Sequence, residues 1–65
     1  MSFDAFFQNA VALHQAGRLD DAENIYRNLL EISPQNTDLL YLIGMIALQK
    51  NAPDSALEFL YKAVR

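Results

Sequence analysis

The chain has no cysteine, and this absence limits how so short a protein can be stabilised. It contains 65 residues, among them only two glycines and two prolines. A domain of about 60 residues buries only about 60% of its unfolded surface, so disulfides, bound metals or association usually supplement its core. Disulfides and thiolate metal sites are excluded here. Close helix packing, a partner chain or further sequence is therefore expected to complete the core.

Positive charge is scarce as well, since five Lys and Arg residues oppose eight Asp and Glu residues and leave a formal net charge of −3. The basic residues are scattered rather than gathered in one stripe, so no nucleic-acid partner is expected. The longest apolar run, Leu39–Leu48, is far shorter than the roughly 20 residues of a membrane span. The N-terminus lacks the positive region of a secretory signal. The sequence predicts a soluble, cytoplasmic protein without a membrane partner.

Apolar residues, by contrast, are plentiful. They make up 52% of the chain, which is too many for a disordered segment. Three short breaks, at residues 16–18, 33–36 and 51–53, separate four segments in which apolar residues recur three and four positions apart. This spacing is typical of amphipathic helices, and no alternating strand pattern occurs. The sequence therefore predicts an all-α fold of four helices.

Several residues at the predicted helix ends suit those positions. Ser2 and Thr37 are the predicted N-caps of the first and third helices. Pro53 is expected at the first position of the fourth helix. Gly17 and Asn51 are residue types that accept the positive φ often needed where a helix ends.

The chain also contains an internal repeat. Displacing the sequence against itself by 34 residues aligns its two halves, including their breaks. Identical pairs are Asp4 with Asp38, Gln15 with Gln49, Asp20 with Asp54, and Ala22 with Ala56. Elsewhere residue class agrees, as where Phe7 aligns with Tyr41. Two copies of one helical hairpin are predicted.

This repeat resembles the tetratricopeptide repeat (TPR) family. The residues that carry the resemblance are Phe6, Ala10, Leu13, Gly17, Ala22, Tyr26 and Pro34 in the first half, and Leu40, Ile43, Gly44, Ala56, Leu60 and Ala63 in the second. Asn9, Asn51 and Leu60 depart from the family pattern. The resemblance implies two antiparallel helix-turn-helix units in a short right-handed α-solenoid. It implies a single domain over residues 1–65, with repeat 1 at about 3–36 and an incomplete repeat 2 at about 37–65.

Small residues indicate where the paired helices come close. Ala10 and Gly44 lie in the middle of the first and third predicted helices, and they are expected to face Ala22 and Ala56. A glycine inside a helix is about 1 kcal/mol less favourable than alanine. A close helix contact at Gly44 would offset that loss.

The two ends of the repeat array differ in composition. Leu39, Ile43 and Ile46 are expected to pack on the first repeat, whereas the equivalent Ala5, Asn9 and Ala12 are small or polar, as a terminal capping repeat requires. The fourth helix instead carries a surplus apolar face formed by Leu57, Leu60, Tyr61 and Val64, with Phe59 adding to it. Stacked repeats generally need three or more units. This face is therefore predicted to receive a further repeat of a longer protein, or to form a homo-oligomer with another copy.

Catalytic chemistry has little support in the sequence. His14 is the single histidine, and the serines lie at predicted helix starts or turns, where capping accounts for them. No Ser-His-Asp constellation, glycine-rich phosphate loop or set of metal ligands is expected. The segment is predicted to be non-enzymatic and to bind no cofactor.

Binding of a protein or peptide is better supported. By resemblance, the first helix of each repeat lines a concave surface, and the predicted binding residues are Asp4, Phe7, Val11 and His14 with Asp38, Tyr41, Met45 and Leu48. The Lys and Asn residues with which family members bind a terminal carboxylate are missing from the matching positions. The surface is apolar and has acidic residues at its edge. This favours as partner an amphipathic or extended apolar segment with basic flanks. Alternatively, another part of a longer chain covers it.

Three functions remain open at this point. The favoured one is a protein-interaction module that binds a peptide or partner helix and forms the N-terminal part of a longer protein. The second is a TPR segment appended to an enzyme such as a glycosyltransferase or methyltransferase, presenting substrate without doing chemistry. The third is a structural self-association unit.

Overall fold

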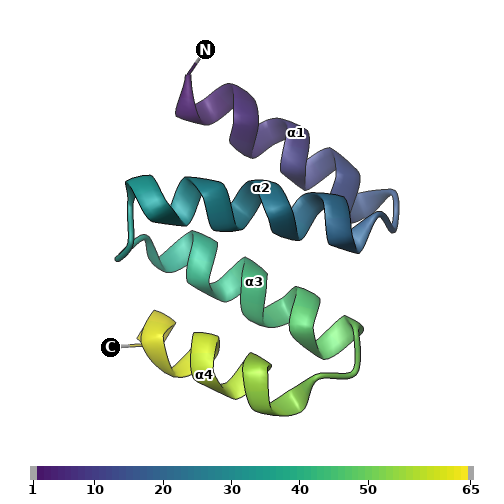
Figure 1. Cartoon of the computed structure of the whole chain (residues 1–65), viewed down its shortest axis with the longest axis vertical. Coiled ribbons are helices and arrows are strands. Elements are labelled where there is room, and N and C mark those ends of the chain that lie inside the picture. Colours follow the sequence, from purple (N-terminus) through teal and green to yellow (C-terminus); the bar gives the residue numbers. More distant parts are fainter. Residues whose placement is uncertain (1, 65) are drawn as a thin grey trace.

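The computed structural model describes residues 2–64, which form four α-helices joined by short turns (Figure 1). They are α1 (Phe3–Gln15), α2 (Leu19–Ile32), α3 (Thr37–Gln49) and α4 (Pro53–Val64). The described residues contain no β-strand, and the four helices form two hairpins. The predicted all-α fold is confirmed.

Most of the predicted helix ends are confirmed. Oγ of Ser2 accepts a hydrogen bond from the backbone N–H of Ala5 at 3.2 Å. Gly17 and Asn51, which end the turns after α1 and α3, have φ values of 84° and 64°. α4 begins at Pro53 as expected.

The predicted cap of α3 is wrong by one residue. Asn36, not Thr37, is the N-cap, and its side-chain oxygen accepts a hydrogen bond from the backbone N–H of Leu39 at 3.2 Å. Thr37 is the first residue of the helix. Asn and Thr are both good N-caps, so two adjacent candidates could not be separated by residue type.

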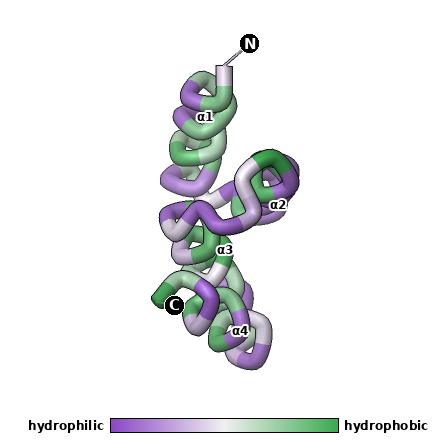
Figure 2. Tube along the Cα trace, turned by 90° about the vertical axis from the view of Figure 1, so that its left-hand side faces the viewer, coloured by the Kyte–Doolittle hydropathy of each residue, from purple (hydrophilic) through white to green (hydrophobic). Residues whose placement is uncertain are grey.

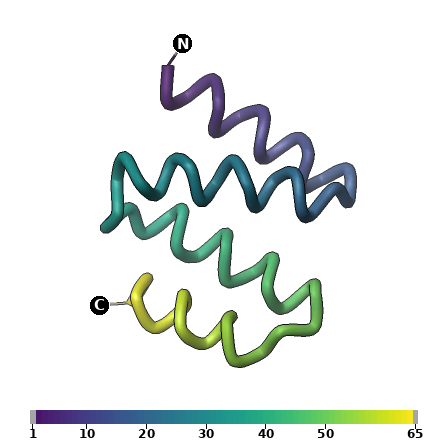
Figure 3. Tube along the Cα trace, in the orientation of Figure 1, coloured from purple at the N-terminus to yellow at the C-terminus, as the bar shows by residue number. Residues whose placement is uncertain are grey.

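The helices stack in chain order, with α2 packed against both α1 and α3, and α3 packed against α4. Figure 2 shows α1 and α3 in one column with α2 displaced to one side. Figure 3 shows α1 and α4 at opposite ends of the stack. The molecule measures 32 × 25 × 13 Å along its principal axes, so it is a thin slab in which each helix keeps a surface side.

The core lies where α2 packs between α1 and α3. Its fully buried members are Ala10, Ala22, Tyr26, Leu39 and Ile46, each 0% exposed. Ile43 is 1% exposed, so the predicted packing of this α3 face on the first repeat is confirmed. Ala5, Asn9 and Ala12 on α1 are exposed, as expected for an outer face.

Gly44 marks the close approach of α3 to α4. A Cβ atom at this position would lie 2.9 Å from Cγ and Cδ2 of Leu60 and 3.4 Å from the carbonyl oxygen of Ala56. The predicted contact is thus present. Its nearest partner is the Leu60 side chain, rather than the Ala56 side chain that residue size alone suggested.

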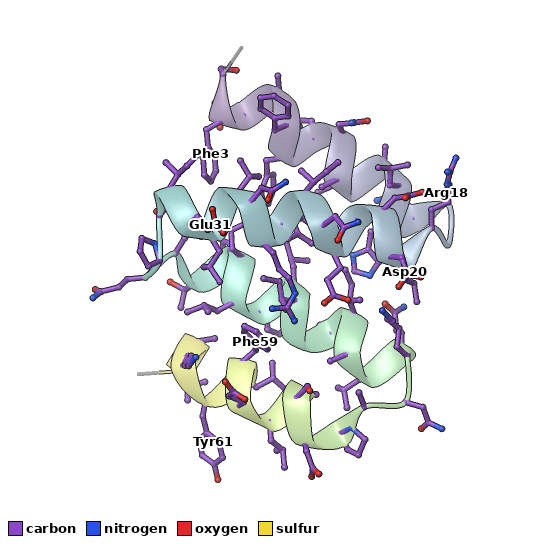
Figure 4. All side chains as sticks on the ribbon, viewed as in Figure 1. Phe3, Arg18, Asp20, Glu31, Phe59 and Tyr61 are labelled. Carbon is purple, nitrogen blue, oxygen red and sulfur yellow. The ribbon has the colours of Figure 1, made fainter. Side chains whose placement is uncertain are left out.

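One aromatic residue differs from expectation. Phe59 is 8% exposed and belongs to the core, so its assignment to the surplus face of α4 is wrong. At about 100° per residue, Phe59 lies on the opposite side of the helix from Leu57, and Figure 4 shows it directed toward α3. Phe6 is 40% exposed, whereas Phe3 and Phe7 pack against the core.

Candidate interaction surfaces

The eight predicted binding residues form one row on α1 and one row on α3, here called the α1/α3 face. Within each helix they are spaced three or four apart, so they share a side. The members are Asp4, Phe7, Val11 and His14 on α1, and Asp38, Tyr41, Met45 and Leu48 on α3. Tyr41 is 52% exposed and Leu48 is 48% exposed, although both are large and apolar. The α3 row therefore exposes two large apolar side chains to solvent.

Tyr26 of α2 packs against the α1 row from the interior of the protein. Its ring centroid lies 6.0 Å from that of Phe7 and 6.2 Å from that of His14. The Tyr26 side chain is fully buried, and burial raises the pKa of its hydroxyl. This hydroxyl has no hydrogen-bond partner among residues 2–64. The unpaired hydroxyl could not be predicted from the sequence.

Replacing Tyr26 with phenylalanine is expected to stabilise the protein. The ring contacts remain, while an unsatisfied buried hydroxyl, which destabilises by about 1–3 kcal/mol, is removed. We expect Tyr26→Phe to raise the free energy of unfolding by about 1 kcal/mol, measured by urea denaturation. A loss of stability would show that the hydroxyl has a partner in solution.

A hydrogen bond joins the two rows at one end of the face. Nε2 of His14 lies 2.7 Å from Oε1 of Gln49, so the tautomer protonated at Nε2 donates to the amide oxygen. The bond connects the last turns of α1 and α3. Gln49 is not among the eight predicted binding residues, and pairing it with His14 needed the relative position of the two helices.

Two carboxylates lie at the other end of the face. Asp4 and Asp38 occupy the first turns of α1 and α3, and both are exposed. Because α2 runs antiparallel to both helices, α1 and α3 begin at the same edge of the slab (Figure 1). The acidic residues predicted at the edge of the surface therefore lie at one end of the face rather than around it.

The predicted surplus residues of α4 also come together, and are here called the α4 face. Leu57, Leu60, Tyr61 and Val64 line an open hollow of about 180 Å³. Leu57, Tyr61 and Val64 are 55%, 67% and 81% exposed, and Leu60 is half-buried. Figure 4 shows Tyr61 directed away from the other helices. The four predicted residues of α4 thus form one patch.

The family model for the tetratricopeptide repeat matches residues 13–64, which include all of α2, α3 and α4. The chain belongs to the tetratricopeptide repeat family. No curated protein and no solved structure matched it. TPR units are generally non-catalytic scaffolds for protein–protein interaction.

The two TPR units are also held together by a charged network that the sequence did not predict. Lys50, the C-cap of α3, forms ion pairs with Asp20 and with Glu23 of α2, the latter at 3.2 Å. Nε of Arg27 donates to the second oxygen of Glu23 at 2.7 Å, and the Arg27 guanidinium lies 5.0 Å above the ring of Phe59 on α4. Of these contacts, only the Glu23–Arg27 pair has the i,i+4 spacing at which a helix brings two side chains together.

The network makes stability depend on pH through Glu23. Burial tends to raise the pKa of the Glu23 carboxyl, but hydrogen bonds from Arg27 and Lys50 outweigh burial, so this pKa lies below its usual 4.5. A carboxyl group whose pKa is lower in the folded state than in the unfolded state stabilises the protein when the pH is above its unfolded-state pKa. This stabilisation is lost as the pH falls through the folded-state pKa.

Acidification should therefore destabilise the wild-type chain more than a Glu23→Gln variant. We expect the free energy of unfolding of the wild type to fall more steeply below about pH 4.5, as measured by urea denaturation at several pH values. Glu31→Gln, on the same helix but outside the network, is the control and should follow the wild type. Parallel curves for Glu23→Gln and wild type would contradict this role.

Residues 2–64 have a further hollow. A larger open hollow of about 520 Å³ lies beside the turn at residues 33–36, and its charged lining residue Lys62 bonds to Glu58 at 3.4 Å. Within residues 2–64, no three His, Asp or Glu side chains are grouped as a metal ion would need. None of the four described helices has both the length and the apolar composition that crossing a membrane requires.

Proposed function

We propose that this chain is a TPR-type protein-interaction module that binds an apolar segment of a partner protein on its α1/α3 face. The observation that carries the proposal is the exposure of Tyr41 and Leu48, which are 52% and 48% exposed on a helix whose other sides are buried. The hydrophobic core is formed without these two side chains. Exposed aromatic and aliphatic side chains in a row are typical of surfaces that bind an extended peptide or an amphipathic helix.

The support beneath the face favours binding without rearrangement. Tyr26 contacts Phe7 and His14, and the His14–Gln49 bond fixes the two rows at one end. A surface held in place by packing loses little conformational entropy when a partner binds. The segment binds and positions its partner and carries out no chemistry of its own.

Selection from a random peptide library tests this function. Peptides enriched on the wild-type chain are expected to be apolar and to lose binding when Val11 and Met45 are replaced by lysine, as measured by fluorescence anisotropy. Lysine at Ala5 and Ala12, which are exposed on the outer side of α1, is the control and should leave binding intact. Enriched peptides that bind the Val11/Met45 variant equally well, or no enrichment at all, would contradict the proposal.

The α4 face favours a second role, which is self-association. Its hollow and its three exposed apolar side chains form a patch that a second copy can cover symmetrically. α4 has Asp54 in its first turn and Lys62 in its last turn, so antiparallel pairing of two α4 helices brings opposite charges together. A single helix face is smaller than the roughly 800 Å² per partner of a standard interface, so the dimer is expected to be weak.

Sedimentation analysis over a range of concentrations tests this second role. The average mass is expected to rise with concentration for the wild type, but not for Leu57→Glu. A wild-type chain that stays monomeric at the highest concentration would exclude the homo-oligomer. The predicted cytoplasmic location, and a parent enzyme to which the segment is appended, remain predictions from the sequence.

A further inference from the structure

We propose that the partner segment carries Lys or Arg at one end, and that it binds with this end over Asp4 and Asp38. The inference rests on the function proposed above for the α1/α3 face, and it adds the chemistry and the direction of the bound segment. Its basis is the unequal distribution of charge along the face.

The acidic end is formed by equivalent residues of the two repeats. Asp4 and Asp38 are 34 residues apart, lie in the first turns of α1 and α3, and are both exposed. Among residues 2–64, no Lys, Arg or His side chain lies within ion-pair distance of either carboxylate. A helix N-terminus carries only about half a positive charge, so a full carboxylate charge leaves each terminus negative.

The opposite end has a different charge. Lys50 directly follows the last residue of α3 and pairs with Asp20 and Glu23. Arg18 follows the turn after α1, directly before α2, and pairs with Asp21. Figure 4 shows Arg18 and Asp20 at the edge of the molecule away from Phe3, where α1 begins. Here the face itself ends in the hydrogen-bonded His14–Gln49 pair. One end thus has carboxylates without an ion-pair partner among residues 2–64, whereas at the other end Asp20, Asp21 and Glu23 are paired with Arg18 or Lys50.

A bound segment with a basic end is attracted more strongly in one direction than in the other. Its apolar part contacts Phe7, Tyr41 and Met45, while its Lys or Arg residues lie near the carboxylates. In the reverse direction, the basic end would meet carboxylates that already pair with Arg18 and Lys50. Such charge complementarity fixes orientation and raises the association rate, and it weakens as salt rises.

Three synthetic peptides provide the probes for this inference. All contain the same six apolar residues, followed by two glutamines, and they are preceded by two lysines, two glutamines or two glutamates. We expect the lysine peptide to bind about tenfold more tightly than the glutamate peptide at low salt, as measured by fluorescence anisotropy. Asp4→Asn combined with Asp38→Asn should abolish this difference.

A matched control separates local charge from net charge. Glu31→Gln combined with Asp54→Asn changes the net charge equally, at exposed positions outside the face, and should preserve the preference. Direction is measured with a spin label on the lysine end, which should broaden the amide signals of residues 4–7 and 38–41 more than those of residues 13–15 and 47–49.

The outcomes distinguish this inference from the proposed function. If the three peptides bind the wild type equally well and lose binding in the Val11/Met45 lysine variant, the result contradicts the proposed basic end of the partner segment. The α1/α3 face would then remain a binding surface. If the spin label instead broadens the amide signals at the His14–Gln49 end more strongly, the proposed direction of the bound segment is wrong. No binding of any of the three peptides, or binding unaffected by that variant, would contradict the use of the face itself.

Discussion

Replacing Gly44 with leucine is expected to destabilise the protein by about 3 kcal/mol or more, and to unfold its second repeat. The Cβ atom alone would lie 2.9 Å from two atoms of Leu60, and the rest of the side chain would force α3 and α4 apart. A chain of this length has a total stability of only about 3–10 kcal/mol. We expect circular dichroism to show a melting temperature lowered by more than about 10 °C, or no cooperative transition.

Two further variants separate the steric effect from helix propensity. Gly44→Ala gains about 1 kcal/mol of helix propensity but still places a Cβ atom against Leu60, so its stability should lie between those of wild type and Gly44→Leu. Leu60→Ala removes the two atoms that the new side chain meets. Combined with Gly44→Leu, it should restore part of the lost stability, although the carbonyl oxygen of Ala56 remains at 3.4 Å. Strictly additive effects, or a wild-type melting curve for Gly44→Leu, would contradict the close contact.

The fold was predictable from the sequence because local signals and the repeat agree. The 34-residue displacement aligned the small residues, the turns and the apolar rows of the two halves. Each of these patterns indicates one particular place in a helical hairpin. Gly17 and Asn51 adopt the positive φ that their residue types permit. Where two neighbouring residues had equal capping ability, as at Asn36 and Thr37, the sequence could not choose between them.

Contacts between the repeats were less predictable, because they depend on how α2 sits against α3 and α4. Phe59 appeared to belong to the α4 face by composition, but its side chain lies under Arg27 of α2. The ion pairs of Lys50 with Asp20 and Glu23 join residues that no helical spacing relates. The members of the α1/α3 face could be chosen by spacing, whereas their exposure and the support from Tyr26 required coordinates.

Replacing Tyr41 with glutamate is expected to cause the largest loss of partner binding. Tyr41 is the most exposed apolar residue of the α1/α3 face at 52%, and it lies in the second turn of α3, between Asp38 and the apolar Met45. Removing a central aromatic anchor from an interface commonly weakens binding by about 2 kcal/mol or more. With a peptide selected on the wild-type chain, we expect the dissociation constant to rise by at least about 30-fold, while the circular dichroism spectrum and melting temperature stay unchanged.

Tyr61→Glu is the matched control, because Tyr61 is also an exposed tyrosine on a helix but belongs to the α4 face. It introduces the same charge and removes the same ring, so any effect of net charge or helix propensity is shared by the two variants. We expect Tyr61→Glu to bind the peptide as the wild type does and to abolish self-association, whereas Tyr41→Glu does the reverse. Equal effects of the two substitutions on peptide binding would show that the two surfaces do not act separately.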